Sequence, residues 1–122
     1  MKYFVLICAF FIFNAANAQE KFLDTIEAGW QGKPVCVVLQ EDEKMRMLTC
    51  TYPPGVGQDR HYHPPYMGYV LQGGTLKSTS ASGTRESTSV TGTSFNSSGT
   101  QWHELINVGD TTVQFLAIEG KN

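Results

Sequence analysis

The sequence YPPGVGQDRHYHPPYMGYVLQGG, residues 52–74, decides the fold and carries the first half of a candidate site. Alternate side chains of an extended strand point to the same face, so His61 and His63 can hold one ion between them. Two imidazoles do not complete a metal site. The only other histidine of the chain is His103, in the segment TQWHELINVGD. We therefore expect all three histidines to form one site.

Two spaced patterns in the chain resemble the two motifs of the cupin superfamily. The first consists of Gly55, five further residues, His61-Tyr62-His63, Tyr69-Val70-Leu71 and Gly73-Gly74. The second consists of Gly92, Ser98-Gly99-Thr100, His103 and Asn107. The resemblance extends over about residues 33–120. It implies an all-β fold, a small antiparallel β-barrel or jelly roll of the cupin double-stranded β-helix type. It also implies a divalent metal bound by His61, His63 and His103.

The chain departs from the cupin pattern at the acidic ligand of the first motif. Counted from His63 that position falls on Met67, and counted back from Tyr69 it falls on Tyr66. Neither residue is a carboxylate. Glu104 does not replace it, because in a strand it lies on the face opposite His103. The resemblance thus implies a three-histidine site, and it transfers no particular cupin activity.

Three imidazoles suit several divalent transition metals, here Fe, Mn, Zn, Ni or Cu, and the sequence does not distinguish among them. Three protein ligands leave a coordination position for water or substrate, which is typical of a working metal rather than a structural one. Packed, hydrogen-bonded histidines without an ion are the alternative interpretation. No general base is evident beside the histidines, which favours oxygen or Lewis-acid chemistry over proton abstraction.

Two functions follow from this site. The first is a metal-dependent small-molecule enzyme of oxygenase type, since three-histidine cupins resemble iron oxygenases that act on thiols or diketones. The second is a non-catalytic protein that binds or senses a metal or small molecule. In either case a small molecule is the expected ligand or substrate.

Four residues near the histidines are candidates for the pocket. Tyr66 and Tyr69 are expected to donate to a bound anion or to pack in the core, and Met67 to fill the wall. Asn107 is expected to hydrogen-bond behind the site or at a strand end. Among their neighbours, Asp59 is interpreted as a solvated loop acid, and Gln58 and Arg60 as exposed because their parity differs from that of the histidines.

Several runs indicate strands separated by turn signals, with no long helix between them. Val35–Leu39 is predicted to be a buried strand and residues 45–52 its returning partner. The Ser/Thr-rich segment 75–100 is either disordered or a polar pair of strands turning at Ser82-Gly83, and we favour the strands. Residues 101–107 and 111–119 complete an antiparallel barrel or sandwich. The cupin resemblance selects the barrel.

Cys36 and Cys50 fall opposite each other if their strands turn about Glu43, which places them within reach of a disulfide. The rival interpretation is a Cys/His nucleophile, which requires a base, and no histidine is spare. An exported chain meets an oxidising compartment, and this favours the Cys36–Cys50 disulfide.

Residues 1–18 have the pattern of a secretory signal peptide, with Lys2, an apolar run and Ala16-Asn17-Ala18 before Gln19. The run is too short for a membrane anchor, which needs about 20 residues. We expect cleavage after Ala18, a single cupin domain over residues 19–122, and a secreted or periplasmic protein. Removal of Lys2 takes the formal net charge from −2 to about −3.

The remaining composition limits the partners of the mature chain. Lys and Arg are scattered, without a basic run, so nucleic acid is not an expected partner. No second apolar segment suggests a membrane role after cleavage. A homodimer is expected, because small cupins resemble dimers and a short chain gains buried core by sharing strands.

Overall fold

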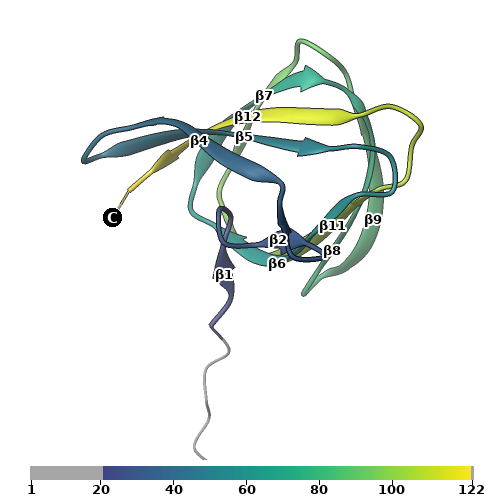
Figure 1. Cartoon of the computed structure of the whole chain (residues 1–122), viewed down its shortest axis with the longest axis horizontal. Coiled ribbons are helices and arrows are strands. Elements are labelled where there is room, and N and C mark those ends of the chain that lie inside the picture. The colour runs from purple at the N-terminus through teal and green to yellow at the C-terminus, as the bar shows by residue number, and fades with distance from the viewer. Residues whose placement is uncertain (1–20, 122) are drawn as a thin grey trace, which may run out of the picture.

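The computed structural model of the chain describes residues 21–121, which form twelve strands in two five-stranded sheets and one short ribbon (Figure 1). The first sheet has the order β1 (Leu23–Asp24), β6 (Gly57–His63), β11 (Thr100–Asn107), β8 (Gly74–Ser80) and β9 (Gly83–Ser89). The second has the order β10 (Ser94–Ser97), β7 (Tyr66–Gln72), β12 (Val113–Gly120), β5 (Met45–Tyr52) and β4 (Cys36–Glu41). The ribbon pairs β2 (Gly29–Trp30) with β3 (Lys33–Pro34).

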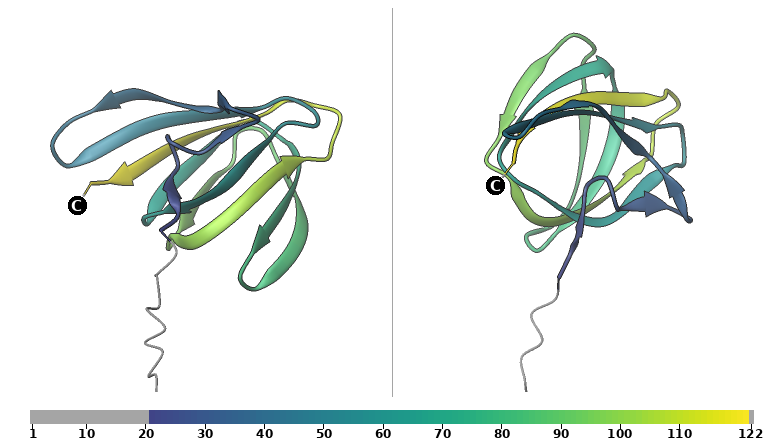
Figure 2. Two further views of the ribbon diagram at one scale, coloured as in Figure 1. Left: turned by 60° about the horizontal axis from the view of Figure 1, so that its bottom comes forward. Right: turned by 60° about the vertical axis from the view of Figure 1, so that its left-hand side comes forward.

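The two large sheets curve around a common interior, as the right-hand view of Figure 2 shows. Every strand pair is antiparallel except β1 with β6, which is parallel. Consecutive strands alternate between the sheets along much of the chain, from β5 to β6 to β7 to β8. The expected all-β barrel is therefore confirmed. No helix in the described part of the chain is long and apolar enough to cross a membrane.

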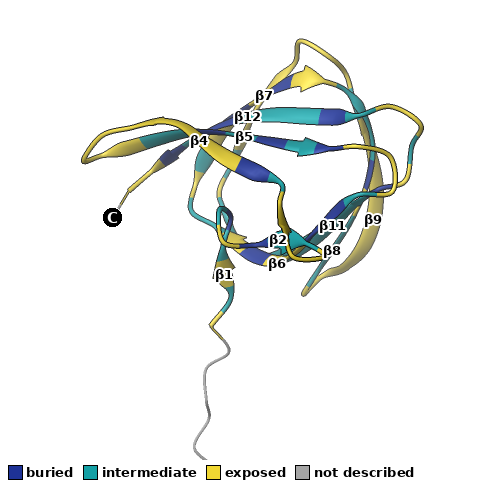
Figure 3. Cartoon of the chain, in the orientation of Figure 1, coloured by how far each residue is buried: buried dark blue, intermediate teal, exposed yellow. Residues whose placement is uncertain are grey.

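The core lies between the sheets, where inward side chains of β4, β5 and β12 in the second sheet meet Leu76 of β8 in the first. Its buried residues are Cys36, Leu48, Cys50, Tyr52, Val70, Leu76, Val113 and Ala117. Figure 3 shows short dark, buried segments on β5 and β12 that alternate with teal, half-buried ones. Burial of every second residue is what a strand with one packed face requires.

The predicted strand at Val35–Leu39 is present, but it is not buried as expected. In the structure β4 runs from Cys36 to Glu41, and after Cys36 all its residues are exposed. The reason is its place in the sheet: β4 is an edge strand, and among residues 21–121 it pairs with β5 alone. The β4–β5 hairpin projects beyond the barrel, at the left of Figure 1.

The register of β4 and β5 places Cys36 opposite Cys50, and the two form a disulfide with an S–S distance of 1.96 Å. Both cysteines of residues 21–121 are therefore in this disulfide, which removes the Cys/His nucleophile for that part of the chain. The Ser/Thr-rich segment forms strands rather than a disordered region. Cross-strand hydroxyl pairs Thr75–Thr88 and Thr79–Thr84 join β8 to β9, each at 2.9 Å.

The predicted signal peptide, residues 1–18, lies outside the described residues, and so does the site of its cleavage.

Candidate metal centre

Two neighbouring strands of the first sheet bring the three histidines together. His61 and His63 lie on β6, His103 lies on β11, and the register pairs His103 with His61. The Nε2 atom of His61 lies 3.0 Å from that of His63 and 2.9 Å from that of His103. The ligand atoms of the three residues all lie within 4.8 Å of one another. The cluster expected from the sequence is present.

Irregular pairing on both sides of His103 shapes this cluster. His103 of β11 pairs with His61 of β6, and Leu105 pairs with Gln58. One residue of β11 therefore lies opposite two of β6, Asp59 and Arg60, so β6 carries an extra residue. Such a bulge shifts the parity of a strand by one. Gln58 consequently points inward with His61 and is fully buried, which corrects the expectation that it is exposed. Its side chain accepts from the Tyr52 hydroxyl at 2.6 Å and donates to the Thr25 carbonyl at 2.8 Å.

The Nδ1 atoms of His61 and His63 each face a hydrogen-bond acceptor. For His61 it is the backbone carbonyl of Asp59, at 2.7 Å. For His63 it is a Glu119 carboxylate oxygen at 2.8 Å, with the Thr25 hydroxyl at 3.0 Å. A carbonyl and a carboxylate only accept, so we assign the ring proton of both histidines to Nδ1. Both Nε2 atoms then present lone pairs to each other across 3.0 Å.

Two facing lone pairs at this distance repel each other, and a cation between them removes the repulsion. Two nitrogen ligands at about 2.1 Å from one ion, set at right angles, lie about 3.0 Å apart. The measured Nε2 separations from His61 match this spacing. Imidazole nitrogens with Nδ1 held by a carboxylate or carbonyl are the usual ligands of divalent transition metals. The three residues therefore fit a metal ion.

Burial keeps His61 and His103 in the form that binds metal. Desolvation lowers the pKa of His61 to about 4, and neighbouring His63 adds to the effect. Desolvation, together with His61 and His63, lowers the pKa of His103 to about 3. Both rings are thus neutral near pH 7, which leaves their nitrogen lone pairs available to an ion.

A buried acid from the last strand stands behind the three histidines, but it does not take the place of the missing acidic ligand. Glu119 on β12 is fully buried and contacts His63 at Nδ1, on the ring edge away from the other histidines. It therefore fixes the position of the His63 ring and is not in the cluster of possible ligand atoms. Burial opposes its ionisation, but hydrogen bonds from His63 and Arg46 outweigh burial and lower its pKa. Arg46 Nε lies 2.7 Å from Glu119, and its Nη2 lies 2.7 Å from Asp24.

Sequence reasoning missed Glu119, although a signal was present. Val113, Ala117 and Glu119 have the same parity in the strand Val113–Gly120, and all three are buried. A carboxylate in phase with small apolar residues on a core strand indicates a buried, paired acid.

A cavity of about 690 Å³ opens beside the histidines between the two sheets. His63 and His103 are among its lining residues, and so is Tyr66. The Tyr66 ring lies against the His63 ring, with centroids 4.8 Å apart. Burial raises the pKa of Tyr66, so its phenol stays protonated. Of the four candidate pocket residues, Tyr66 is the one that the structure brings to the cavity.

The other three lie elsewhere. Met67 and Tyr69 are exposed, at 55% and 43%, on the outer face of β7. The alternate residues of that strand, Gly68 and Val70, are the ones that are buried. Asn107 is buried at the end of β11, where its amide donates to the Tyr52 and Thr111 carbonyls at 2.7 Å. Its predicted role at a strand end is confirmed, while the pocket role is not.

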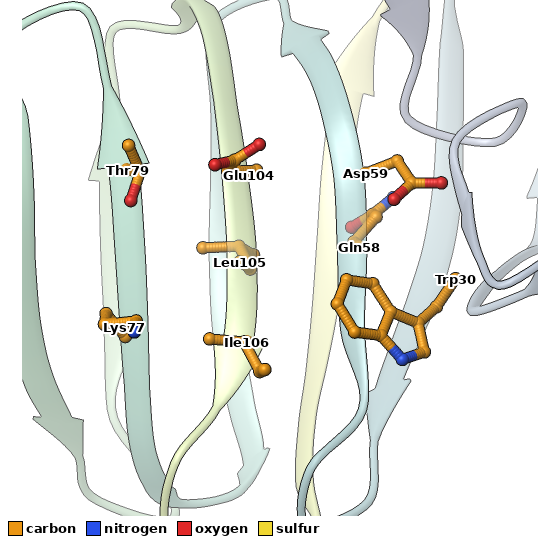
Figure 4. A pocket seen from close by; sticks show the side chains of 8 residues that line it. All are labelled: Trp30, Gln58, Asp59, Lys77, Thr79, Glu104, Leu105 and Ile106. Carbon is orange, nitrogen blue, oxygen red and sulfur yellow. The ribbon is translucent and has the colours of Figure 1, made fainter.

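The outer face of the first sheet carries the remaining polar residues discussed above. Asp59 and Arg60 are exposed, and Arg60 pairs with Glu104 at 3.3 Å over the Trp102 ring. A smaller hollow of about 320 Å³ lies on this face (Figure 4). It is lined by Trp30, Gln58, Asp59, Lys77, Thr79, Glu104, Leu105 and Ile106. It contains none of the histidines.

No family model matches the chain, and no curated protein matches it. Many solved structures do. A cupin domain from Bordetella pertussis Tohama I superposes with a TM-score of 0.67 at 24% identity, over 85% of this chain and 100% of that chain. A polyketide cyclase from Streptomyces resistomycificus gives 0.57 at 15% identity, over 84% and 79% of the two chains. A predicted oxalate decarboxylase from Thermotoga maritima gives 0.51 at 20%, over 68% and 76%.

These identities are low, so the likeness concerns the fold. Together with the two curved sheets and their strand order, it shows that this chain has the double-stranded β-helix fold of the cupin superfamily.

Proposed function

We propose that the protein is a metal-dependent enzyme that acts on a small molecule, with one divalent transition metal held by His61, His63 and His103. The observation that carries this proposal is that the Nε2 atoms of His61 and His63 face each other 3.0 Å apart, at the wall of a cavity. Packed histidines without an ion would be expected to turn one nitrogen toward a donor. Here the Nδ1–H groups of His61 and His63 already donate to the Asp59 carbonyl and the Glu119 carboxylate. Their Nε2 atoms are therefore left for a cation.

The cavity supports a substrate site rather than a closed structural one. His63 and His103 line it, so an ion bound to them is reached from the cavity. Its volume, about 690 Å³, lies in the usual range for sites that bind small molecules. Tyr66, which stays protonated, is placed to donate a hydrogen bond to an anionic group bound beside His63.

We propose oxygenase-type chemistry as the reaction class. The residues lining the cavity include no carboxylate, and Glu119 is sealed behind His63 by its contacts with Arg46. Proton abstraction by a side chain is therefore poorly supported. A bound transition metal supplies Lewis acidity and, in the case of iron, electron-transfer chemistry. The chain contributes the orientation of the imidazoles, the exclusion of water behind His61 and the shape of the cavity. Two fold relatives are named a polyketide cyclase and a predicted oxalate decarboxylase, which shows that this fold accommodates enzymes.

The second candidate is a non-catalytic protein that binds a metal or a small molecule at the same site. The network Asp24–Arg46–Glu119–His63 favours it, because it fixes the position of one ligand as tightly as a binding site requires. The same feature also serves an enzyme, so only an assay separates the two.

The test is oxygen uptake by the protein reconstituted with Fe²⁺. The probes are a thiol (cysteamine), a diketone (acetylacetone) and a hydroxylated dicarboxylate (tartrate), each with wild type and with His103→Ala. Uptake with one probe that is lost in His103→Ala supports the enzyme. Probe binding without uptake, in a chain that retains its iron, rejects the oxygenase in favour of the binding protein.

We propose further that the chain is exported and begins at Gln19 after cleavage. The Cys36–Cys50 disulfide supports this, because disulfides persist in oxidising compartments such as the periplasm or the extracellular space. The intact mass of the exported protein tests it. A mass that includes residues 1–18 would reject the cleavage.

We also propose a homodimer. The edge strand β4 supports it, since Val37 and Leu39 are 52% and 54% exposed on a strand with one free edge. Such edges are usually paired or protected. Light scattering at micromolar concentration tests the proposal, and a monomeric mass would reject it.

A further inference from the structure

The cavity beside the histidines has two chemically different walls. The wall formed by β8, β9, the end of β10 and the loop after it is rich in hydroxyl groups, contributed by Ser78, Ser80, Ser87, Ser89, Ser97 and Ser98. The wall formed mainly by the second sheet is apolar and includes Phe95, Phe115 and Ala117. A ligand that fits this cavity has hydrogen-bonding groups along one side.

One cation other than histidine lines this cavity, and it is Arg85 on β9. Gly83, Arg85, Ser87 and Ser89 share one parity of that strand, and all four line the cavity, so Arg85 lies on the cavity side of β9, where it is also exposed to solvent. Its sequence neighbour Glu86 takes the outer face and lies opposite Lys77 across the β8–β9 ladder. The cross-strand partner of Arg85 is Ser78, which is uncharged.

No acidic residue lines the cavity, and Arg85 forms no ion pair within residues 21–121. This contrasts with Arg46, whose guanidinium bonds two carboxylates. A cavity with an arginine, hydroxyl donors and a metal-binding cluster, but no carboxylate, favours a ligand with negative charge.

The sheet register gives the distance between Arg85 and the histidines. His103 pairs with Ser80 on β8, and Ser78, two residues further along, pairs with Arg85 on β9. Two strand spacings across the sheet and two residues along it place the Cα atoms of His103 and Arg85 about 12 Å apart. Both residues line the cavity, so the gap between their side chains is on the scale of a small molecule.

We propose that Arg85 is an anion-binding subsite and that the ligand of the cavity is a small hydroxylated dicarboxylate. One carboxylate lies at the three-histidine metal, the other pairs with Arg85, and hydroxyl groups between them bond the serines of β8 and β9. This inference rests on the proposed function for the first carboxylate only. Arg85 and the serines belong to the chain whether or not a metal is bound. Arginine binds a carboxylate through two parallel hydrogen bonds, which explains why a second carboxylate is selected.

The experiment compares three probes by calorimetric titration at 0.15 M ionic strength. Tartrate has two carboxylates and hydroxyls, glycerate has one carboxylate with hydroxyls, and succinate has two carboxylates without hydroxyls. The variants are Arg85→Gln, Arg85→Lys and the matched control Lys77→Gln, which removes a cation from the outer face of the neighbouring strand. Metal content is measured in every sample before and after titration, because tartrate also binds metals in solution.

We expect wild type to bind tartrate more tightly than glycerate or succinate. Arg85→Gln weakens tartrate binding about 10- to 100-fold and leaves glycerate binding nearly unchanged, because a charged hydrogen-bonding partner is lost. Arg85→Lys recovers part of the loss, and Lys77→Gln binds like wild type. Equal tartrate affinity in wild type and Arg85→Gln, or no tartrate binding by wild type, overturns the proposal.

The same titrations separate this proposal from the proposed function. A wild-type chain that holds no metal contradicts the metal centre. The Arg85 comparison is then made in the metal-free protein, where tartrate must still bind more weakly to Arg85→Gln than to wild type. If it does not, the anion subsite is rejected as well.

Discussion

Replacement of Glu119 by Gln is the most informative single change outside the three ligands. Gln keeps the size of the side chain and removes its negative charge. Glu119 Oε1 lies 2.8 Å from His63 Nδ1, and the side chain is fully buried. Through the ring and a metal–nitrogen bond of about 2.1 Å, the carboxylate lies about 7 Å from a bound ion.

The expected loss follows from two estimates. At an effective dielectric constant of about 20, a carboxylate attracts a divalent ion at this distance by about 5 kcal/mol. That figure is an upper bound, because the site relaxes after the change. Replacement of a hydrogen-bonding partner of a metal-bound histidine typically costs 10- to 100-fold in affinity. We expect about 100-fold for Glu119→Gln, because Arg46 remains at the site and its charge then opposes the ion.

The assay is equilibrium titration with Co²⁺, whose visible absorption also reports the ligand geometry. Glu104→Gln is the matched control, since Glu104 neighbours His103 but points outward to Arg60. We expect the control to bind Co²⁺ like wild type. Thermal unfolding of the metal-free variants checks that each is folded. A folded Glu119→Gln protein that binds Co²⁺ within about threefold of wild type would refute the role assigned to Glu119.

Two further changes test the contribution of the disulfide to stability and the outward position of Met67. The double change Cys36→Ala and Cys50→Ala should lower the free energy of unfolding by about 3 kcal/mol, because the disulfide closes a loop with a sequence separation of 14. Chemical denaturation measures this loss. An unchanged midpoint would show that the disulfide does not stabilise the chain. Met67→Glu should leave Co²⁺ affinity unchanged, because Met67 is 55% exposed on the outer face of β7. Tighter binding in that variant would show that the side chain reaches the ion.

The sequence carries much of the fold because its signals are local. Alternation, prolines, glycines and the spacing of the two histidine-containing segments predict the strands and the cluster of His61, His63 and His103. The Cys36–Cys50 pairing was also predictable, since a hairpin turning near Glu43 sets the register of both cysteines. The exposure of β4 was not predictable, because whether a strand lies at the edge of a sheet depends on its neighbours in space.

The parts that sequence reasoning missed depend on non-local pairing. The bulge in β6 reverses the parity of Gln58, and nothing in the segment Gln58-Asp59-Arg60 marks it. Glu119 reaches His63 across a sequence separation of 56, through a contact between sheets. Met67 and Tyr69 were assigned to the pocket from the cupin motif, whereas the pleat of β7 turns both outward.

The measurement that tests the central claim most directly is the Co²⁺ content of the folded protein after equilibrium dialysis. Wild type, His63→Ala, His103→Ala and the control Glu104→Gln are compared at one free concentration of the ion. The three-histidine site predicts one Co²⁺ per chain in wild type and in the control, and little or none in either alanine variant. Equal Co²⁺ content in wild type and both alanine variants would contradict it.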